Sequence, residues 1–184
     1  WIGPPPDVIG RLGDKIEAKQ IARAANVPVI PGIDHVTEAE QVRRWMREEN
    51  VSFPVMLKAA GGGGGRGMVK VEHDAHLHMA IGQARSEAKK FFGSETVLAE
   101  KYVERGRHIE VQIIADAHGN VVHLYERECT IQRRHQKIVE EAPSPTLDTQ
   151  LREEICATAV RLMREIGYAS AGTVEFLFDS ETRK

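Results

Sequence analysis

Residues 58–68 read K-A-A-G-G-G-G-G-R-G-M, with five consecutive glycines, an arginine and a sixth glycine. A run rich in strand-forming residues, F-P-V-M-L-K-A at 53–59, leads into the glycines, and M-V-K-V at 68–71 follows them. This pattern predicts two strands joined by a glycine loop. Because glycine has no Cβ, such a loop can take positive φ angles and direct several N–H groups at one phosphate.

The glycine loop allows two interpretations, a flexible tip without a ligand or a phosphate-binding loop. Its spacing is neither G-x-G-x-x-G nor G-x-x-x-x-G-K-[ST]. A spacer would mix glycine with serine and join separately folded units, whereas these glycines join two strands of one unit. Lys58 before the loop and Arg66 within it favour phosphate binding, and we expect the loop to be the least ordered part of the chain.

The residues on either side of the loop predict a small α/β unit. Capping-box patterns predict helices that begin at Asp14 and Thr37, and a third helix is expected from Asp74. The stretch T-V-L-A-E-K-Y at 96–102 predicts the next strand. The opening W-I-G-P-P-P-D is expected to be the end of a strand that runs into a turn.

From Arg107 the pattern becomes that of antiparallel strands. R-H-I-E-V-Q-I-I and V-V-H-L-Y-E-R-E predict two strands around a turn at A-H-G-N, and I-Q-R-R-H-Q-K at 131–137 predicts a third. In the first of these strands Ile109, Val111 and Ile113 alternate with His108, Glu110 and Gln112, which predicts one apolar and one polar face. In the strand at 131–137, alternation would place Gln132, Arg134 and Gln136 on one face and Arg133, His135 and Lys137 on the other. A helix is expected from Asp148 through Ile166, with Gly167 as its cap.

Composition describes a soluble globular protein of 184 residues, with 41% hydrophobic and 28% charged residues. A net charge of −2 and 5% aromatic residues predict no binding to nucleic acid or to an anionic membrane surface. The two cysteines, Cys129 and Cys156, have no metal-binding spacing, and no apolar run is long enough to span a bilayer. We therefore expect a reducing, cytoplasmic compartment.

Several polar residues could carry chemistry. Lys58 would lie beside a bound phosphate, and Lys15 begins a helix whose N-terminus favours an anion. Glu175 stands in the apolar stretch T-V-E-F-L-F, where a carboxylate needs a cation, a metal ion or solvent. The polar face His108, Glu110 and Gln112 forms one cluster with the charged run at 132–137. This cluster could line a polar cavity, form a solvated edge strand or bind nucleic acid, although the net charge and the lack of interleaved aromatic residues disfavour nucleic acid.

Taken together, the motifs resemble the biotin carboxylase component of biotin-dependent carboxylases such as pyruvate, acetyl-CoA or propionyl-CoA carboxylase, an ATP-grasp enzyme. The matching stretches are W-I-G-P-P-P-D-V-I-G-R-L-G-D-K, F-P-V-M-L-K-A-A-G-G-G-G-G-R-G-M, E-K-Y-V-E-R-G-R-H-I-E-V-Q, E-R-E-C-T-I-Q-R-R-H-Q-K-I-V-E-E-A-P and G-Y-A-S-A-G-T-V-E-F-L-F. They occur in family order along nearly the whole chain.

The resemblance implies an α+β ATP-grasp fold, with a small α/β lid subdomain and the first part of a larger antiparallel-sheet subdomain, truncated at both ends. Residues 1–30 would link to a missing N-terminal domain, residues 31–103 would form the lid, and residues 104–184 would begin the larger subdomain. The ending D-S-E-T-R-K is expected to be a hairpin turn whose second strand is absent.

The resemblance also implies roles for individual residues. Lys137 matches the residue that binds bicarbonate and His135 a further residue at the reaction centre, while Glu175 matches a carboxylate that binds magnesium or manganese. The residues that match ATP contacts are Lys15, Lys58, Gly63, Gly64, Gly65, Met68, Glu100, Lys101, Val103, His108, Gln132, His135 and Glu175.

The implied reaction is ATP-dependent carboxylation of biotin on a carrier protein or domain. ATP would phosphorylate bicarbonate to carboxyphosphate, and biotin would be the tethered co-substrate. A carboxyltransferase component is the expected partner, the full-length enzyme would be a homo-oligomer, and a eukaryotic parent would lie in the mitochondrial matrix. The fragment alone is expected to lack full activity. Alternatives are a carbamoyl phosphate synthetase-like ligase and a non-catalytic folding or interaction module.

Overall fold

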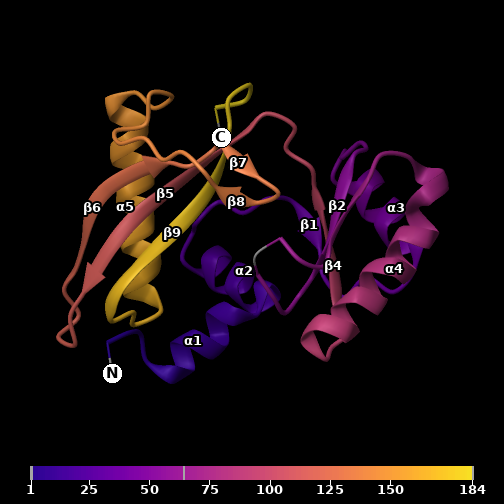
Figure 1. The fold of residues 1–184 in the computed structure, drawn as a ribbon, viewed down its shortest axis with the longest axis horizontal. Helices are drawn as coiled ribbons and strands as arrows, with labels where there is room; N and C mark the ends of the chain where they lie inside the picture. The colour runs from indigo at the N-terminus through magenta and orange to yellow at the C-terminus, as the bar shows by residue number, and fades with distance from the viewer. Residues whose placement is uncertain (1, 64, 184) are drawn as a thin grey trace. The chain divides into compact units, whose positions relative to one another are not determined.

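The computed structural model describes residues 2–63 and 65–183, which form two compact units (Figure 1). The glycine-loop unit comprises Leu12–Gln20 and Pro28–Tyr102, and the long-strand unit comprises the chain up to Arg11, Ile21–Val27 and the chain from Val103 onward. The proposed subdomains at 1–30, 31–103 and 104–184 stay a prediction. Within the described residues, no helix has the length and apolar character needed to cross a membrane.

A four-stranded antiparallel sheet organises the glycine-loop unit. Its order is β1 (Gly32–Ile33), β4 (Val97–Lys101), β2 (Val55–Ala59) and β3 (Met68–Val71). The glycines therefore join neighbouring strands, as predicted, and Lys58 pairs with Met68 across the loop. Along β2 the residues Val55, Leu57 and Ala59 are buried and the residues between them are half-buried, so one face of the sheet supplies the core.

Two helices cover that apolar face. Helices α3 (Ala39–Glu48) and α4 (Asp74–Phe92) lie on one side of the sheet in Figure 1, and their buried residues join the strand side chains in one core. The cap of α3 differs from the prediction: Glu38 is the capping residue, and the side chain of Gln41 accepts from its N–H at 2.9 Å. Glutamate is an uncommon helix cap, whereas threonine is a preferred one, so the sequence pattern indicates Thr37 and not Glu38.

The N-terminal residues form two helices, α1 (Pro6–Gly13) and α2 (Lys15–Ala24). For the described part of W-I-G-P-P-P-D, residues 2–7, the prediction of a strand end was wrong: residues 2–5 form no strand, and Pro6 begins α1, where its missing N–H costs nothing. Asp14 caps α2 as predicted: its Oδ1 accepts from the backbone N–H groups of Ile16 at 2.8 Å and Glu17 at 3.0 Å.

The long-strand unit has a three-stranded antiparallel sheet in the order β6 (Val121–Glu128), β5 (Gly106–Ala115) and β9 (Ser170–Asp179). The residues Ile109, Val111 and Ile113 of β5 are fully buried, which confirms the predicted apolar face. Helix α5 (Thr149–Glu165) lies along one face of this sheet (Figure 1), and Asp148 caps it by accepting from Leu151 N–H at 2.9 Å.

The predicted strand at 131–137 is instead a tight hairpin of β7 (Gln132–Arg133) and β8 (Gln136–Lys137). Arg134 and His135 both have positive φ, 52° and 64°, and so form the two-residue turn. Such turns usually carry Asn-Gly or Asp-Gly, so Arg-His gave no turn signal. Gln132 consequently pairs with Lys137 and does not alternate with it.

Two buried carboxylates on β6 hold the segment that follows this hairpin. Glu126 accepts from Ser144 N–H at 3.0 Å and from Arg152 Nε at 2.8 Å, and Glu128 accepts from the hydroxyls of Ser144 and Thr146, each at 2.7 Å. Burial by itself would raise the pKa of Glu126 and of Glu128, but these donors lower both below the ordinary 4.5. Both carboxylates therefore stay ionised at neutral pH.

Acid is expected to destabilise the protein through these groups. Because the folded-state pKa lies below the unfolded value of 4.5, the stabilisation is complete above that pH and is lost as the pH falls through the folded pKa. The melting temperature of the wild type should therefore fall more steeply as the pH drops below about 4.5 than the melting temperature of Glu126→Gln, which lacks one of the two titrating groups. Glu153→Gln, at an exposed position, is the matched control. If the melting temperature of E126Q depends on pH in the same way as that of the wild type, Glu126 is not one of the groups responsible for the loss of stability in acid.

Candidate functional site

A buried carboxylate collects two lysines in the glycine-loop unit. Glu100 lies on β4 with 5% of its surface exposed. Its Oε2 is 2.6 Å from Lys58 Nζ of β2, and its Oε1 is 2.7 Å from Lys19 Nζ of α2. Burial would raise the pKa of Glu100, but Lys58 and Lys19 lower it overall, so the carboxylate is charged and fixes both ammonium groups.

Lys15 brings a third ammonium group to the glycine loop. Its Nζ donates to the carbonyl of Gly62, and its backbone N–H donates to Ala60 O at 3.0 Å. Burial lowers the pKa of Lys15, and the charge of Lys58 lowers it further, which places these two cations in range of each other. Lys19 and Lys58 pair with Glu100, and Lys15 is influenced by the charges of Glu100 and Asp14. Three ammonium groups against two carboxylates leave an excess of positive charge that suits an anion.

The glycine loop is closed at its base and needs glycine at defined positions. Ala59 N–H donates to Gly67 O at 2.8 Å, and Gly62, Gly65 and Gly67 have φ of 124°, 74° and 66°. A Cβ on Gly62 would lie 2.2 Å from the Phe92 ring. These conformations match a loop that presents backbone N–H groups to a ligand, and they disfavour other residues there.

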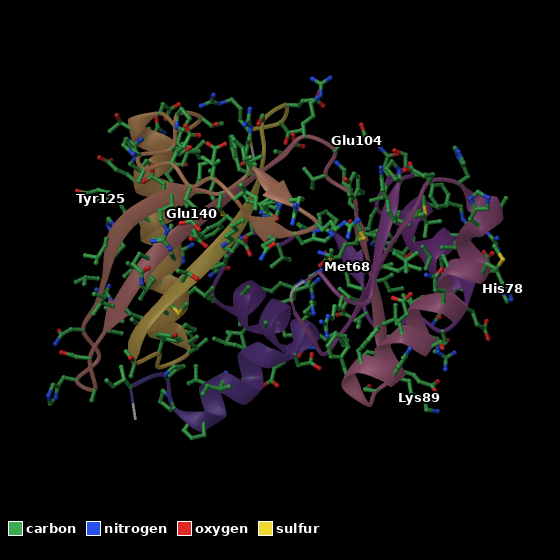
Figure 2. The ribbon with its side chains drawn as sticks, in the orientation of Figure 1. Met68, His78, Lys89, Glu104, Tyr125 and Glu140 are labelled. Carbon is green, nitrogen blue, oxygen red and sulfur yellow. The ribbon has the colours of Figure 1, made fainter. Side chains whose placement is uncertain are left out.

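The remaining predicted residues of this unit lie around that loop. Gly63 is exposed. Gly64 lies outside the described residues, so the expectation that the glycine loop is the least ordered part of the chain stays a prediction at this residue. Met68 begins β3 directly after the loop, where Figure 2 labels it. Lys101 ends β4 with its N–H bonded to Pro31 O at 2.9 Å, and Val103 is the first residue after the boundary of the unit.

A second charged cluster lies on the sheet of the long-strand unit, around Glu110 of β5. Glu110 is 4% exposed and faces Arg127 of β6 and Glu175 of β9 in the strand register. Arg127 binds its Oε1 through Nη2 at 2.6 Å and Nε at 2.9 Å, and Lys137 of β8 donates to its Oε2. Burial would raise the pKa of Glu110, but Lys137 and Arg127 lower it.

Glu175 is the open carboxylate of this cluster. Its Oε1 lies 3.2 Å from His108 Nδ1 and 3.6 Å from Lys137 Nζ, and its side chain is 48% exposed. The hydrogen bond to His108 lowers the pKa of Glu175, burial opposes this, and Lys137 lowers it further. Although burial would lower the pKa of Lys137, the hydrogen bond to Glu110 and the charge of Glu175 raise it, so its ammonium stays charged.

A metal ion could use part of this cluster. Glu110, Cys129 and Glu175 have ligand atoms within 4.8 Å of one another. Both oxygens of Glu110 are already bound by cations, and a thiol suits softer metals than magnesium. Glu175 alone therefore fits Mg²⁺, which commonly uses one or two carboxylates together with substrate phosphates.

The other two predicted residues of this unit lie on the hairpin. The side chain of Gln132 donates to Cys129 O at 2.9 Å, which ties β7 to the end of β6. His135 occupies the exposed turn, and among described residues it has no hydrogen bond or ion pair. The structure therefore brings His108, Lys137 and Glu175 together and leaves His135 apart from their contacts.

Sequence reasoning missed Lys19 and Arg127, which complete the two clusters. Lys19 follows Lys15 by one helical turn, so the spacing alone could have placed both on one face of α2. Arg127 lies in E-R-E on β6, but only the register shows that it faces Glu110. Strand pairing cannot be read from one strand alone.

Known proteins that are similar to this chain include ATP-binding proteins, in agreement with a glycine loop flanked by lysines. Residues 14–184 match the family model described as the carbamoyl-phosphate synthase L chain, ATP binding domain. Biotin carboxylase 2 of Bacillus subtilis (strain 168) is 48% identical over 182 residues, which are 98% of this chain and 40% of that protein. The chain thus spans well under half the length of this curated relative.

Two solved structures are similar throughout the chain. A biotin carboxylase-beta-gamma-ATP complex from Campylobacter jejuni has a TM-score of 0.93 and 45% identity, over 99% of this chain and 40% of that one. The biotin carboxylase domain of 2-oxoglutarate carboxylase from Hydrogenobacter thermophilus, with MgADP, ADP and bicarbonate, has a TM-score of 0.90 and 43% identity over 97% and 39%. The predicted ATP-grasp α+β fold is confirmed.

Proposed function

The chain belongs to the family of the carbamoyl-phosphate synthase L chain ATP-binding domain, and we propose that it is part of a biotin carboxylase. The full-length enzyme would be an ATP-dependent ligase that carboxylates biotin on a carrier protein or domain. The observation that carries this proposal is the placement of Lys15 and Lys58 beside a closed glycine loop. The relatives that resemble the chain throughout support the same activity.

In the glycine-loop unit, the proposed ligand is ATP. Lys15 and Lys58 would neutralise phosphate charge, Gly63, Gly64 and Gly65 would supply N–H groups, and Met68 would border the nucleotide. We propose that Glu100, Lys101 and Val103 contact the adenosine part. Glu100 already orients Lys58 at 2.6 Å, so it would also hold that ammonium in place for the phosphates.

In the long-strand unit, the proposed ligands are bicarbonate and a divalent ion. Lys137 keeps its charge and would bind bicarbonate, while His108, Gln132 and His135 would contact the nucleotide. Glu175 would hold Mg²⁺ or Mn²⁺, which supplies charge neutralisation at the phosphates when bound. Positioning and charge are the main requirements of phosphoryl transfer, and each cluster by itself holds charged side chains in fixed positions.

The reaction proposed for the parent enzyme joins ATP and bicarbonate to give carboxyphosphate and ADP. Carboxyphosphate then splits into CO2 and phosphate, N1′ of biotin loses its proton to the departing phosphate, and N1′ forms a bond to CO2. A labile intermediate of this kind requires exclusion of water, which a loop that closes over the phosphates would provide. The expected partners are a biotin carrier and a carboxyltransferase component, in a homo-oligomer of the cytoplasm or the mitochondrial matrix.

Steady-state assays of the full-length enzyme test the proposal. We expect ATP hydrolysis that depends on both bicarbonate and biotin, with carboxybiotin as a product. Formation of carbamoyl phosphate from ammonia in place of carboxybiotin would favour the carbamoyl phosphate synthetase-like alternative. ATP turnover that is indifferent to bicarbonate, or no turnover and no effect of Mg-ATP on melting temperature, would refute the proposal.

A further inference from the structure

Arg127 has no role in the scheme above, yet it is bound directly to the carboxylate at the centre of the Glu110 cluster. It lies directly across the sheet from Glu110. Its Nε and Nη2 both donate to Glu110 Oε1, at 2.9 and 2.6 Å, and its Nη1 donates to Gln112 Oε1 at 3.1 Å. The guanidinium is therefore fixed by side chains two positions apart on β5.

This arrangement divides Glu110 between two cations. Arg127 occupies Oε1 and Lys137 occupies Oε2. Lys137 lies on β8, a strand of two exposed residues that pairs with β7 and with no other strand of the described residues. Its ammonium therefore depends on Glu110 for its position, and the orientation of Glu110 depends on the planar fork of Arg127.

The positive charge that Lys137 can offer to an anion also depends on Arg127, because the two cations share the one negative charge of Glu110. Glu110 carries one negative charge, is 4% exposed and faces two cations. Glu140, labelled in Figure 2, lies 3.6 Å from Arg127, and Glu175 lies 3.6 Å from Lys137, but both carboxylates are nearly half exposed and solvent screens them. Without Arg127, the buried charge of Glu110 would be balanced by Lys137 alone.

We propose that Arg127 is a positioning residue for the anion bound by Lys137. It holds Glu110 so that Oε2 fixes the ammonium of Lys137, and it shares the charge of Glu110 so that Lys137 retains attraction for bicarbonate. This role rests on the proposed function, because it presumes that Lys137 binds bicarbonate. Because Arg127 and Lys137 both contact Glu110, loss of Arg127 should change the KM for bicarbonate more than the KM for ATP.

The test compares three variants of the full-length enzyme by bicarbonate-dependent ATP hydrolysis. Arg127→Gln should raise KM for bicarbonate at least about tenfold, the loss expected when a charged hydrogen bond is removed, and leave KM for ATP within about twofold. Arg127→Lys keeps the charge without the fork, so it should raise KM for bicarbonate by a smaller factor. Arg107→Gln is the matched control, because Arg107 pairs with the buried Glu128 at 3.1 Å on the same sheet.

The outcomes separate this role from the proposed function. Wild-type enzyme without bicarbonate-dependent turnover would overturn both. Active wild type with an unchanged bicarbonate KM in R127Q, or an equal rise in both KM values, or the same effect in R107Q, would overturn the role of Arg127 alone. If R127Q does not fold, R127K decides: a raised bicarbonate KM with wild-type ATP KM supports the role, and a wild-type bicarbonate KM overturns it.

Discussion

Lys58→Ala is expected to lower kcat/KM for ATP roughly 10- to 150-fold in the full-length enzyme, the range for loss of a charged hydrogen bond worth about 1.5–3 kcal/mol. Lys58 ends β2 next to the glycine loop, and its ammonium is held 2.6 Å from Glu100. Because Glu100 keeps Lys19 at 2.7 Å, its buried charge stays paired in the variant. Nucleotide use should therefore fall more than stability.

The control for this prediction is Lys90→Ala, which removes a lysine from the exposed end of α4. It should leave both the ATP kinetics and the melting temperature at wild-type values. Lys19→Met adds a second comparison, because it removes the other cation from Glu100 and leaves Lys58 in place. A Lys58→Ala enzyme with wild-type KM for ATP and wild-type turnover would refute a phosphate-binding role for this lysine.

Local sequence patterns predicted the elements whose signals are local. Glycines between two apolar runs indicated a loop joining adjacent strands, and the alternation of Ile109, Val111 and Ile113 indicated one buried face; both are confirmed. The hairpin at 132–137 was missed because its turn residues, Arg134 and His135, adopt positive φ without the glycine or asparagine that usually indicates it. Its register then placed Gln132 opposite Lys137.

The candidate clusters were less predictable than the strands that carry them. Lys58 and Glu100 were each identified from the sequence, but their 2.6 Å contact depends on the pairing of β2 with β4. These two strands are neighbours in the sheet, although β3 and α4 lie between them along the chain. Arg127 likewise became visible only through its register with Glu110. Sequence motifs identify residues that could carry chemistry, whereas the pairing of strands in the folded protein determines which of these residues form ion pairs.

Gly32 shows how closely the Glu100 cluster is packed. A Cβ at this position would lie 2.5 Å from the carbonyl oxygen of Ala99 and 3.0 Å from both Glu100 Cγ and Lys19 Nζ. Side-chain ends could move, but the carbonyl belongs to the central strand β4, so either β1 or the sheet must shift. Gly32→Ala is expected to lower the free energy of unfolding by about 3 kcal/mol, the upper part of the range for overpacking.

Urea unfolding of Gly32→Ala beside Gly82→Ala separates this packing effect from the general effect of adding a methyl group. Gly82 lies inside α4, and a Cβ added there would have no other atom within 4 Å, so alanine should raise the free energy of unfolding by about 0.5–1 kcal/mol. The changes in the free energy of unfolding of the two variants should therefore have opposite signs, although both variants add one methyl group. Equal stability changes would show that β1 can move away from Glu100 and Lys19 at little cost, and that the lysine contacts do not depend on a glycine at this point of the sheet.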